Sequence, residues 1–239
     1  MKKIIALIIA VLPFNALRLI CYRRLLGYQI APSARIAPFN VILVERCELG
    51  RITMGPFNLM QLNELKLADN VSIGRFNRIK FITALHVGAS SHMGSWNVAF
   101  GTRPGVSPFK LHEQLKIGES SVITSHHSFD LSDEITLGDD VTIAGDGTQF
   151  WTHGFDLNHV KIQAPITIDD HVYVGSRALI VQGVKITSHT MIGAGTTVSG
   201  SITESGFYVS SALVRKSDVA NYSSAQTVAH GGYNFARRG

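Results

Sequence analysis

From residue 168 onward, an aliphatic residue recurs at every sixth position of the chain. The segments IDDHVY, VGSRAL, IVQGVK, ITSHTM, IGAGTT and VSGSIT follow one another without interruption. Their first residues are Ile168, Val174, Ile180, Ile186, Ile192 and Val198. This spacing matches neither the period of about 3.6 of an amphipathic helix nor the strict alternation of a half-buried strand. The repeat therefore constrains the fold more than any other feature of the sequence.

The same hexads occur earlier in the chain. Pairs of hexads begin at Leu67, Val87, Ile117 and Leu137, and a weaker start is visible at Ile30 and Ile36. Each hexad is expected to be a short strand and a turn, with its aliphatic residue in a narrow core and small or turn-forming residues at the bend. Three hexads would close a triangular coil, and stacked coils bury an aliphatic column that no single repeat could bury alone. The sequence predicts an all-β fold, a left-handed parallel β-helix of hexapeptide repeats, over residues 29–215.

Two segments interrupt the repeat, AFGTRPGVSPFKLHEQLK at about 99–116 and WTHGFDLNHVKIQAP at 151–165. Glycines and prolines in the first segment indicate a loop that leaves one corner of a coil, and the second also departs from the hexad. Binding chemistry is common on loops that project from a rigid scaffold. After about Val214 the repeat stops, and residues 216–239 are expected to be a flexible tail or a loosely docked end-cap.

The N-terminal residues 1–28 form a separate segment. Lys2 and Lys3 precede an apolar run to Phe14, but no small-residue cleavage site follows, and the run is shorter than the roughly 18 residues of a spanning helix. A second apolar series then recurs at helical spacing, and Gly27 can end that helix. Its members are Phe14, Leu17, Ile20, Cys21 and Leu25, with Arg18, Arg23 and Arg24 on the other faces. We expect an amphipathic, membrane-associated helix, kinked at Pro13, whose basic residues meet anionic headgroups; a helix merely packed on the domain and a cleaved signal are the alternatives.

Charge and cysteine content exclude several classes of protein. The formal net charge is +5, yet the basic residues are scattered and no stripe of basic and aromatic residues is present. Nucleic acid is therefore not an expected partner, whereas an anionic ligand or an anionic membrane face is. Cys21 and Cys47 stand alone, which indicates neither a disulfide framework nor a zinc site, and a reducing compartment is the default.

Three further segments carry a resemblance to a known family. They are ITSHHSFD (123–130), GDGTQFWTHG (145–154) and the stretch 172–198, which begins VYVGSRALIVQGVKI and ends MIGAGTTV. With the hexads, they resemble the hexapeptide-repeat acyltransferases, specifically the bacterial O-acetyltransferases of cell-surface polysaccharide synthesis, over residues 30–216. The resemblance implies a homotrimer with active sites between subunits, which moves an acyl group from acetyl-CoA or another acyl-CoA to a hydroxyl of a sugar or glycolipid. It implies no metal, and with the N-terminal segment it suggests a cytoplasmic protein on the inner face of the inner membrane.

The resemblance also implies a histidine that deprotonates the acceptor hydroxyl, because a sugar hydroxyl is a poor nucleophile at neutral pH. His153 is the first candidate, since it lies beside Trp151 where the hexad breaks. His127 is the second, and the sequence does not decide between it and His126. Asp130 could orient an imidazole or bind the acceptor, and Trp151 is a further candidate for substrate contact. A structural role stays open for each histidine.

For the coenzyme, the resemblance implies small residues that let the backbone approach the pantetheine arm. The matching positions are Gly175, Ser176, Gly193 and Ala194, although the fold itself needs small residues there. The side chains that could neutralise coenzyme phosphates are those of Lys185, Arg177 and Arg215.

Other functions remain open on the sequence alone. A γ-carbonic-anhydrase-like metal site could draw on His127, His153 and His159. A non-catalytic β-helix scaffold is a second alternative. A sugar nucleotidyltransferase is not expected, because the roughly 30 residues before Ile30 cannot hold a nucleotide-binding domain. The acceptor sugar and the acyl chain are not identified by the sequence.

Overall fold

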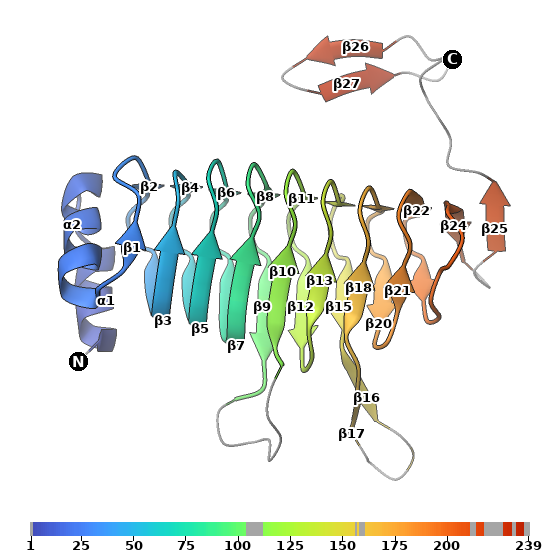
Figure 1. The fold of residues 1–239 in the computed structure, drawn as a ribbon, viewed down its shortest axis with the longest axis horizontal. Helices are drawn as coiled ribbons and strands as arrows, with labels where there is room; N and C mark the ends of the chain where they lie inside the picture. Colours follow the sequence, from blue (N-terminus) through green and yellow to red (C-terminus); the bar gives the residue numbers. More distant parts are fainter. Residues whose placement is uncertain are drawn as a thin grey trace.

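The computed structural model describes residues 2–103, 112–155, 157 and 161–210, together with the backbone of three strands beyond Val209. The hexads form a parallel β-helix whose coils stack along one axis, from the two N-terminal helices to β24 (Gly206–Val209) (Figure 1). The predicted fold is therefore confirmed. The first residue of every predicted hexad is buried, so the aliphatic column forms as expected.

Each coil contributes strands to three faces, which belong to two sheets. The second face consists of short strands: β2 (Arg35–Ile36), β4 (Thr53–Met54), β6 (Ser72–Ile73), β8 (His92–Met93), β11 (Val122–Ile123), β14 (Thr142–Ile143), β19 (Tyr173–Val174), β22 (Thr190–Ile192) and β24. From β2 to β24, each of these strands pairs in parallel with its neighbour in the next coil. The next strand, β25 (Val214–Ser217), pairs with β24 in the antiparallel sense.

The first and third faces are continuous with one another, because three long strands run through the corner between them without a turn. These strands are β3 (Val41–Leu49), β5 (Leu59–Leu67) and β7 (Arg78–Val87). The first face adds β1 (Gln29–Ile30), β10 (Gln114–Ile117), β13 (Ile135–Leu137), β18 (Ile166–Ile168) and β21 (Lys185–Ile186). The third face adds β9 (Val98–Gly101), β12 (Ser128–Leu131), β15 (Gln149–Trp151), β20 (Leu179–Val181) and β23 (Thr197–Val198).

Strands occupy the described parts of both predicted interruptions. β9 continues to Gly101 and β10 begins at Gln114, so strand structure occupies both ends of the first one. The second contains an antiparallel hairpin of β16 (His153–Phe155) and β17 (Lys161–Gln163), which projects from one edge of the solenoid (Figure 1). The C-terminal segment holds a further hairpin of β26 (Thr227–His230) and β27 (Tyr233–Ala236).

A ladder of buried polar side chains holds one corner of the coils together. Asn58 Nδ2 donates to Asn40 Oδ1 at 2.9 Å, and Asn77 Nδ2 donates to Asn58 Oδ1 at the same distance. Asn97 continues the row, because its backbone N–H donates to Asn77 Oδ1. His127 is the next member, and its backbone N–H donates to Asn97 Oδ1. Each amide therefore satisfies buried groups of a neighbouring coil, which fixes the register between coils.

Beside this ladder, a stack of aromatic rings follows the same corner. Phe39, Phe57, Phe76 and Trp96 lie with neighbouring ring centroids 4.9, 5.0 and 4.3 Å apart. All four residues have a left-handed backbone, with φ between 59° and 63°. That conformation costs a non-glycine residue about 1–2 kcal/mol, and we infer that ring stacking offsets part of this cost.

Two helices cover the N-terminal end of the solenoid. The helices are α1 (Lys2–Ala10) and α2 (Asn15–Leu26), separated around Pro13, and Gly27 ends α2 with a φ of 71°, as the sequence predicts. Their inner face packs on the first coil, where Tyr22 is fully buried and its hydroxyl donates to the carbonyl of Asn40. None of the described helices is long and apolar enough to cross a membrane.

Arg18 does not face outward toward lipid headgroups, as the sequence predicted, but is buried. It is 3% exposed, and its guanidinium donates to the carbonyls of Leu12 and Ile36. This arginine therefore ties the chain between the helices to the first coil instead of facing outward. Lys2, Lys3 and Arg24 remain exposed.

We predict that Asn77→Ala lowers the free energy of unfolding by about 2–4 kcal/mol. The substitution leaves the backbone N–H of Asn97 and the backbone carbonyl of Gly94 buried without their partner. Thermal unfolding followed by circular dichroism measures the effect. Asn63→Ala, at an exposed position of β5, is the matched control and should stay within about 0.5 kcal/mol of the wild type. Equal stability of the two variants would contradict a structural role for the ladder.

Candidate active site

The candidate site lies at the edge of the solenoid where the third face ends. There β15 ends at Trp151 and the β16–β17 hairpin begins. Thr152 anchors this departure, because it is fully buried and its hydroxyl donates to the carbonyl of Asp130 at 2.9 Å. The same hydroxyl accepts the backbone N–H of Asp133. These bonds fix the direction in which the next residue, His153, leaves the coil.

His153 and Asp130 form a close pair at this edge. The Nδ1 atom of His153 lies 2.6 Å from Oδ1 of Asp130, and Asp130 is 4% exposed. A buried carboxylate at this distance holds the proton on Nδ1 and fixes the tautomer of the ring. Nε2 is then the nitrogen that can take a proton from a substrate. The side chain of His153 is 20% exposed, so the ring is reachable.

Ser132, Lys161 and Glu113 surround the pair. The hydroxyl of Ser132 lies 3.2 Å from Nδ1 of His153, and Nζ of Lys161 donates to that hydroxyl at 2.8 Å. Glu113 is 1% exposed and accepts the backbone N–H of Thr102 at 2.7 Å. Burial raises the pKa of Glu113, and the Thr102 hydrogen bonds and the charge of Lys161 counteract this in part. The site thus gathers two buried acids and one lysine around the histidine.

Aromatic rings and a glutamine complete the surroundings of His153. The ring of Trp151 lies 6.1 Å from it in a tilted arrangement, and Phe155 meets it edge-on at 5.6 Å. The Nε1 atom of Trp151 donates to Oε1 of Gln149. A side chain at Gly154 would come within 2.9 Å of the amide of Gln182, so the hairpin approaches the next coil closely.

His127 does not join this site. It is 1% exposed and occupies the corner ladder, where Nδ1 accepts the backbone N–H of Thr148 at 3.2 Å and Nε2 lies 2.9 Å from the hydroxyl of Thr124. Both ring nitrogens are thereby engaged inside the coil, and burial lowers the pKa of His127 to about 4. Its neighbour His126 points to the outside of the same corner, where its ring lies parallel to that of Trp96.

The residues expected to bind coenzyme lie at two different places. Gly175, Ser176, Gly193, Ala194 and Arg177 share the corner of the ladder, at the other end of the third face from His153. There a side chain at Gly175 would come within 2.7 Å of the backbone N of Ala194, so coil stacking itself accounts for that glycine. Lys185 begins β21, just beyond the His153 edge, and its Nζ lies 3.4 Å from Asp169. The side chain of Arg215 lies outside the described residues.

No group of three metal-ligating side chains occurs among residues 2–103, 112–155, 157 and 161–210. Of the three histidines considered for a metal site, His127 has both nitrogens occupied and His153 bonds to Asp130. His159 lies outside the described residues.

Sequence reasoning missed four residues that build the site: Thr152, Ser132, Lys161 and Glu113. Thr152, Lys161 and Glu113 lie in the two segments where the hexad breaks, and that break is the sequence signal for them. Ser132 lies outside these segments and reaches His153, 21 positions away, only through the coil, so no local pattern reveals it.

Comparison with known proteins identifies the fold. No family model matches the chain, and no curated protein matches it in sequence. Among solved structures, the polySia-specific acetyltransferase NeuO is 18% identical and aligns over 83% of this chain and 91% of its own, with a TM-score of 0.57. The hexapeptide-repeat-containing acetyltransferase VCA0836 of Vibrio cholerae, in its complex with acetyl coenzyme A, is 17% identical over 92% and 86%, with a TM-score of 0.38. The match to NeuO confirms the resemblance to hexapeptide-repeat acyltransferases at the level of the fold.

We predict that His127→Asn preserves turnover and thermal stability, because asparagine fills the same position in the ladder at Asn97. His127→Ala should lower the melting temperature. The histidine is neutral in the fold but binds a proton in the unfolded chain below about pH 6.5, so the wild type loses stability as pH falls from about 6.5 to 4. His127→Asn should lose less over that range. Loss of turnover in a stable, well-folded His127→Asn protein would restore His127 as a catalytic candidate.

Proposed function

We propose that the protein is an O-acyltransferase that moves an acyl group, most simply acetyl, from acyl-CoA to a hydroxyl of a sugar. The observation that carries this proposal is the 2.6 Å pair of His153 and Asp130 at a reachable edge of the β-helix. A non-catalytic scaffold does not require a buried carboxylate that fixes a partly exposed imidazole. The fold shared with NeuO, a polySia-specific acetyltransferase, adds support for a carbohydrate acceptor.

In the proposed reaction, Nε2 of His153 takes the proton of the acceptor hydroxyl as its oxygen attacks the thioester carbonyl carbon. Asp130 stabilises the imidazolium that forms, because its carboxylate faces Nδ1. The tetrahedral intermediate then collapses, the carbon–sulfur bond breaks, and the imidazolium returns the proton to the coenzyme A thiolate. Lys161 and the hydroxyl of Ser132 lie beside the pair and are candidates to position the acceptor.

We also propose a homotrimer with the coenzyme bound between neighbouring subunits. Gly175, Ser176, Gly193 and Ala194 would let the pantetheine arm approach the backbone, and Lys185, which lies near the His153 edge, would meet a coenzyme phosphate. Closed coils present flat faces that suit such contacts. Light scattering that found a fully active monomer would contradict this arrangement.

We predict that His153→Ala lowers turnover by about 10²- to 10⁴-fold, and that Asp130→Asn also lowers it, because the amide cannot stabilise the imidazolium. Labelled acetyl transfer from acetyl-CoA to candidate surface glycans measures both. His171 and Asp140 provide the matched control, since they form a similar pair at 2.9 Å on an exposed corner. His171→Ala and Asp140→Asn should transfer label normally. Full activity of folded His153→Ala would remove the histidine-base mechanism.

The N-terminal helices support a second part of the proposal, peripheral contact with an anionic membrane surface. The helices and the link between them expose a set of large apolar side chains, namely Ile4, Leu7, Ile8, Val11, Phe14, Leu17, Ile20 and Leu25. Lys2, Lys3 and Arg24 are exposed on the same two helices. An apolar helix face with basic neighbours suits insertion into the headgroup region.

Deleting residues 1–26 is a poor test of this contact, because it would also uncover the first coil that Tyr22 and Ile9 bury. We predict instead that Ile20→Glu with Leu25→Glu abolishes flotation with vesicles that contain phosphatidylglycerol, while the melting temperature stays unchanged. Tyr173→Glu, at an exposed position of the second face, is the control and should still float. Flotation of the double variant at the wild-type level would exclude the helices as the membrane contact.

A further inference from the structure

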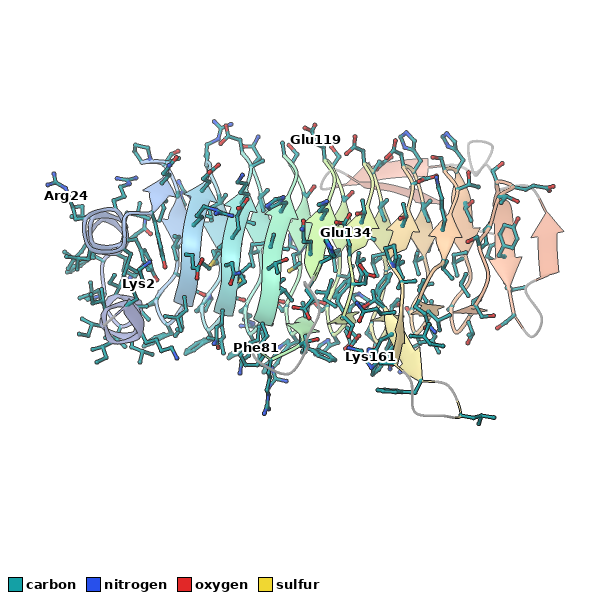
Figure 2. All side chains as sticks on the ribbon, turned by 60° about the horizontal axis from the view of Figure 1, so that its bottom comes forward. Lys2, Arg24, Phe81, Glu119, Glu134 and Lys161 are labelled. Atoms are coloured by element: carbon teal, nitrogen blue, oxygen red, sulfur yellow. The ribbon has the colours of Figure 1, made fainter. Side chains whose placement is uncertain are left out.

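A cleft with a volume of about 420 Å³ runs along the solenoid between α1 and Glu113. It lies on the same edge as the candidate active site. The backbone N–H of Thr83 donates to the carbonyl of Glu113, and the pairing of Leu115 with Ile135 places Glu113 beside Asp133 of the next coil. In Figure 2, Lys2, Phe81 and Lys161 follow one another along the solenoid in this order. The cleft therefore approaches the His153 site from the N-terminal side.

Glu113 is the point where the cleft and the site meet. It lines the cleft together with Thr102, and its buried carboxylate interacts electrostatically with Asp130 and Lys161. Thr102 directly follows Gly101, which pairs with Leu131, the residue after Asp130. A molecule that fills the cleft would thus end next to the His153–Asp130 pair.

The lining combines apolar and hydrogen-bonding groups in the way that a sugar chain requires. Leu43 and Leu62 supply apolar wall, while Asn63 and Thr83 supply polar groups on the edge. Phe81 is an extra residue in β7, with a φ of 61° where the pairing with β5 shifts register, and this bulge places its ring at the cleft. Sugar rings present both C–H faces and hydroxyl groups, so they match both kinds of wall.

The far end of the cleft has a different chemistry. Lys2 and Lys3 line it there together with Glu45, so the lysines leave a net positive charge, and both lysines belong to α1, which exposes Ile4 and Leu7. Two ammonium groups favour a phosphate or diphosphate. An exposed apolar surface beside them favours an aliphatic chain or the membrane that holds it. From the N-terminal end of the edge, the exposed apolar surface of α1 comes first and the two lysines come next. The cleft follows them, and His153 lies at its other end.

We propose that this cleft binds the acceptor, and that the acceptor is a glycan still joined through a phosphate or diphosphate to a membrane lipid. The phosphate meets Lys2 and Lys3, the sugar chain follows the cleft, and the reacting hydroxyl reaches His153. From Glu45 to Asp133 the edge crosses four strand spacings, roughly 19 Å, which leaves room for more than one sugar ring. The claim that the hydroxyl at His153 reacts rests on the proposed acyltransferase function. The claim that the cleft binds a lipid-linked glycan does not rest on it.

The test compares two kinds of vesicle that carry equal negative charge in phosphatidylcholine. One contains a polyprenyl diphosphate linked to N-acetylglucosamine, and the other contains phosphatidylglycerol. Flotation of the wild-type protein should show at least tenfold tighter binding to the first kind. Asn63→Trp, which fills the middle of the cleft from an exposed strand position, should abolish this preference and keep binding to phosphatidylglycerol. Arg75→Glu, an exposed change at the aromatic corner, should behave as the wild type.

Equal binding of the wild type to both vesicles would overturn the proposal, because the lysines would then serve only as a contact for headgroups. A retained preference in Asn63→Trp would overturn it as well. Acetyl transfer is measured separately on the same preparations. Selective binding without transfer from acetyl-CoA would count against the proposed function and leave the cleft assignment standing. Acetyl transfer without selective binding would count against the cleft assignment and leave the proposed function standing.

Discussion

The register between neighbouring coils is the constraint on which the rest of the structure depends. Parallel pairing places each coil one strand spacing, about 4.8 Å, from the next, so a residue's neighbours are the residues at its own position in the coils before and after. The backbone shows how tight this stacking is, since a side chain at Gly74 would come within 2.6 Å of the carbonyl of Gly94. The corner ladder fixes the register with side-chain amides. Asp130 and Trp151 lie side by side for the same reason.

The hexad pattern predicted most of the fold because burial of one aliphatic residue in six is a local property of the chain. Ile180 and Ile192 are fully buried as expected. Strands β3 and β5 were not predicted, since their nine residues pass a corner without glycine or another turn residue to mark it. There the alternation of buried and exposed residues replaces the hexad. The hexad pattern thus marks corners that are turns and does not mark corners that are bent strands.

The candidate site was only partly predictable, because its contacts join residues of different coils that lie far apart in the sequence. His153 stands out in the sequence because the repeat breaks around it, but its partner Asp130 lies 23 positions earlier and becomes a neighbour only through the coil. His127 is a candidate in the sequence because the segment around it, ITSHHSFD, resembles the family. Its position two residues before the buried Phe129 matches that of Asn97 before Ala99, and this match places it in the ladder. The equivalent positions in neighbouring coils thus distinguish the ladder residue His127 from the site residue His153, whereas the local motifs do not.

A stack of paired coils is stiff along its axis, and this has a consequence for how such a site reaches its substrate. α1 and α2 close the end of the solenoid, while the coil that carries Asp133 lies five strand spacings beyond β1, roughly 24 Å away. If the helices lie on a membrane, the rigid scaffold holds the histidine at a fixed distance from that surface. Only a hydroxyl at a matching distance from its lipid would then be acylated. The number of coils between the cap and the hairpin would thus select the position of the acylated sugar along the glycan.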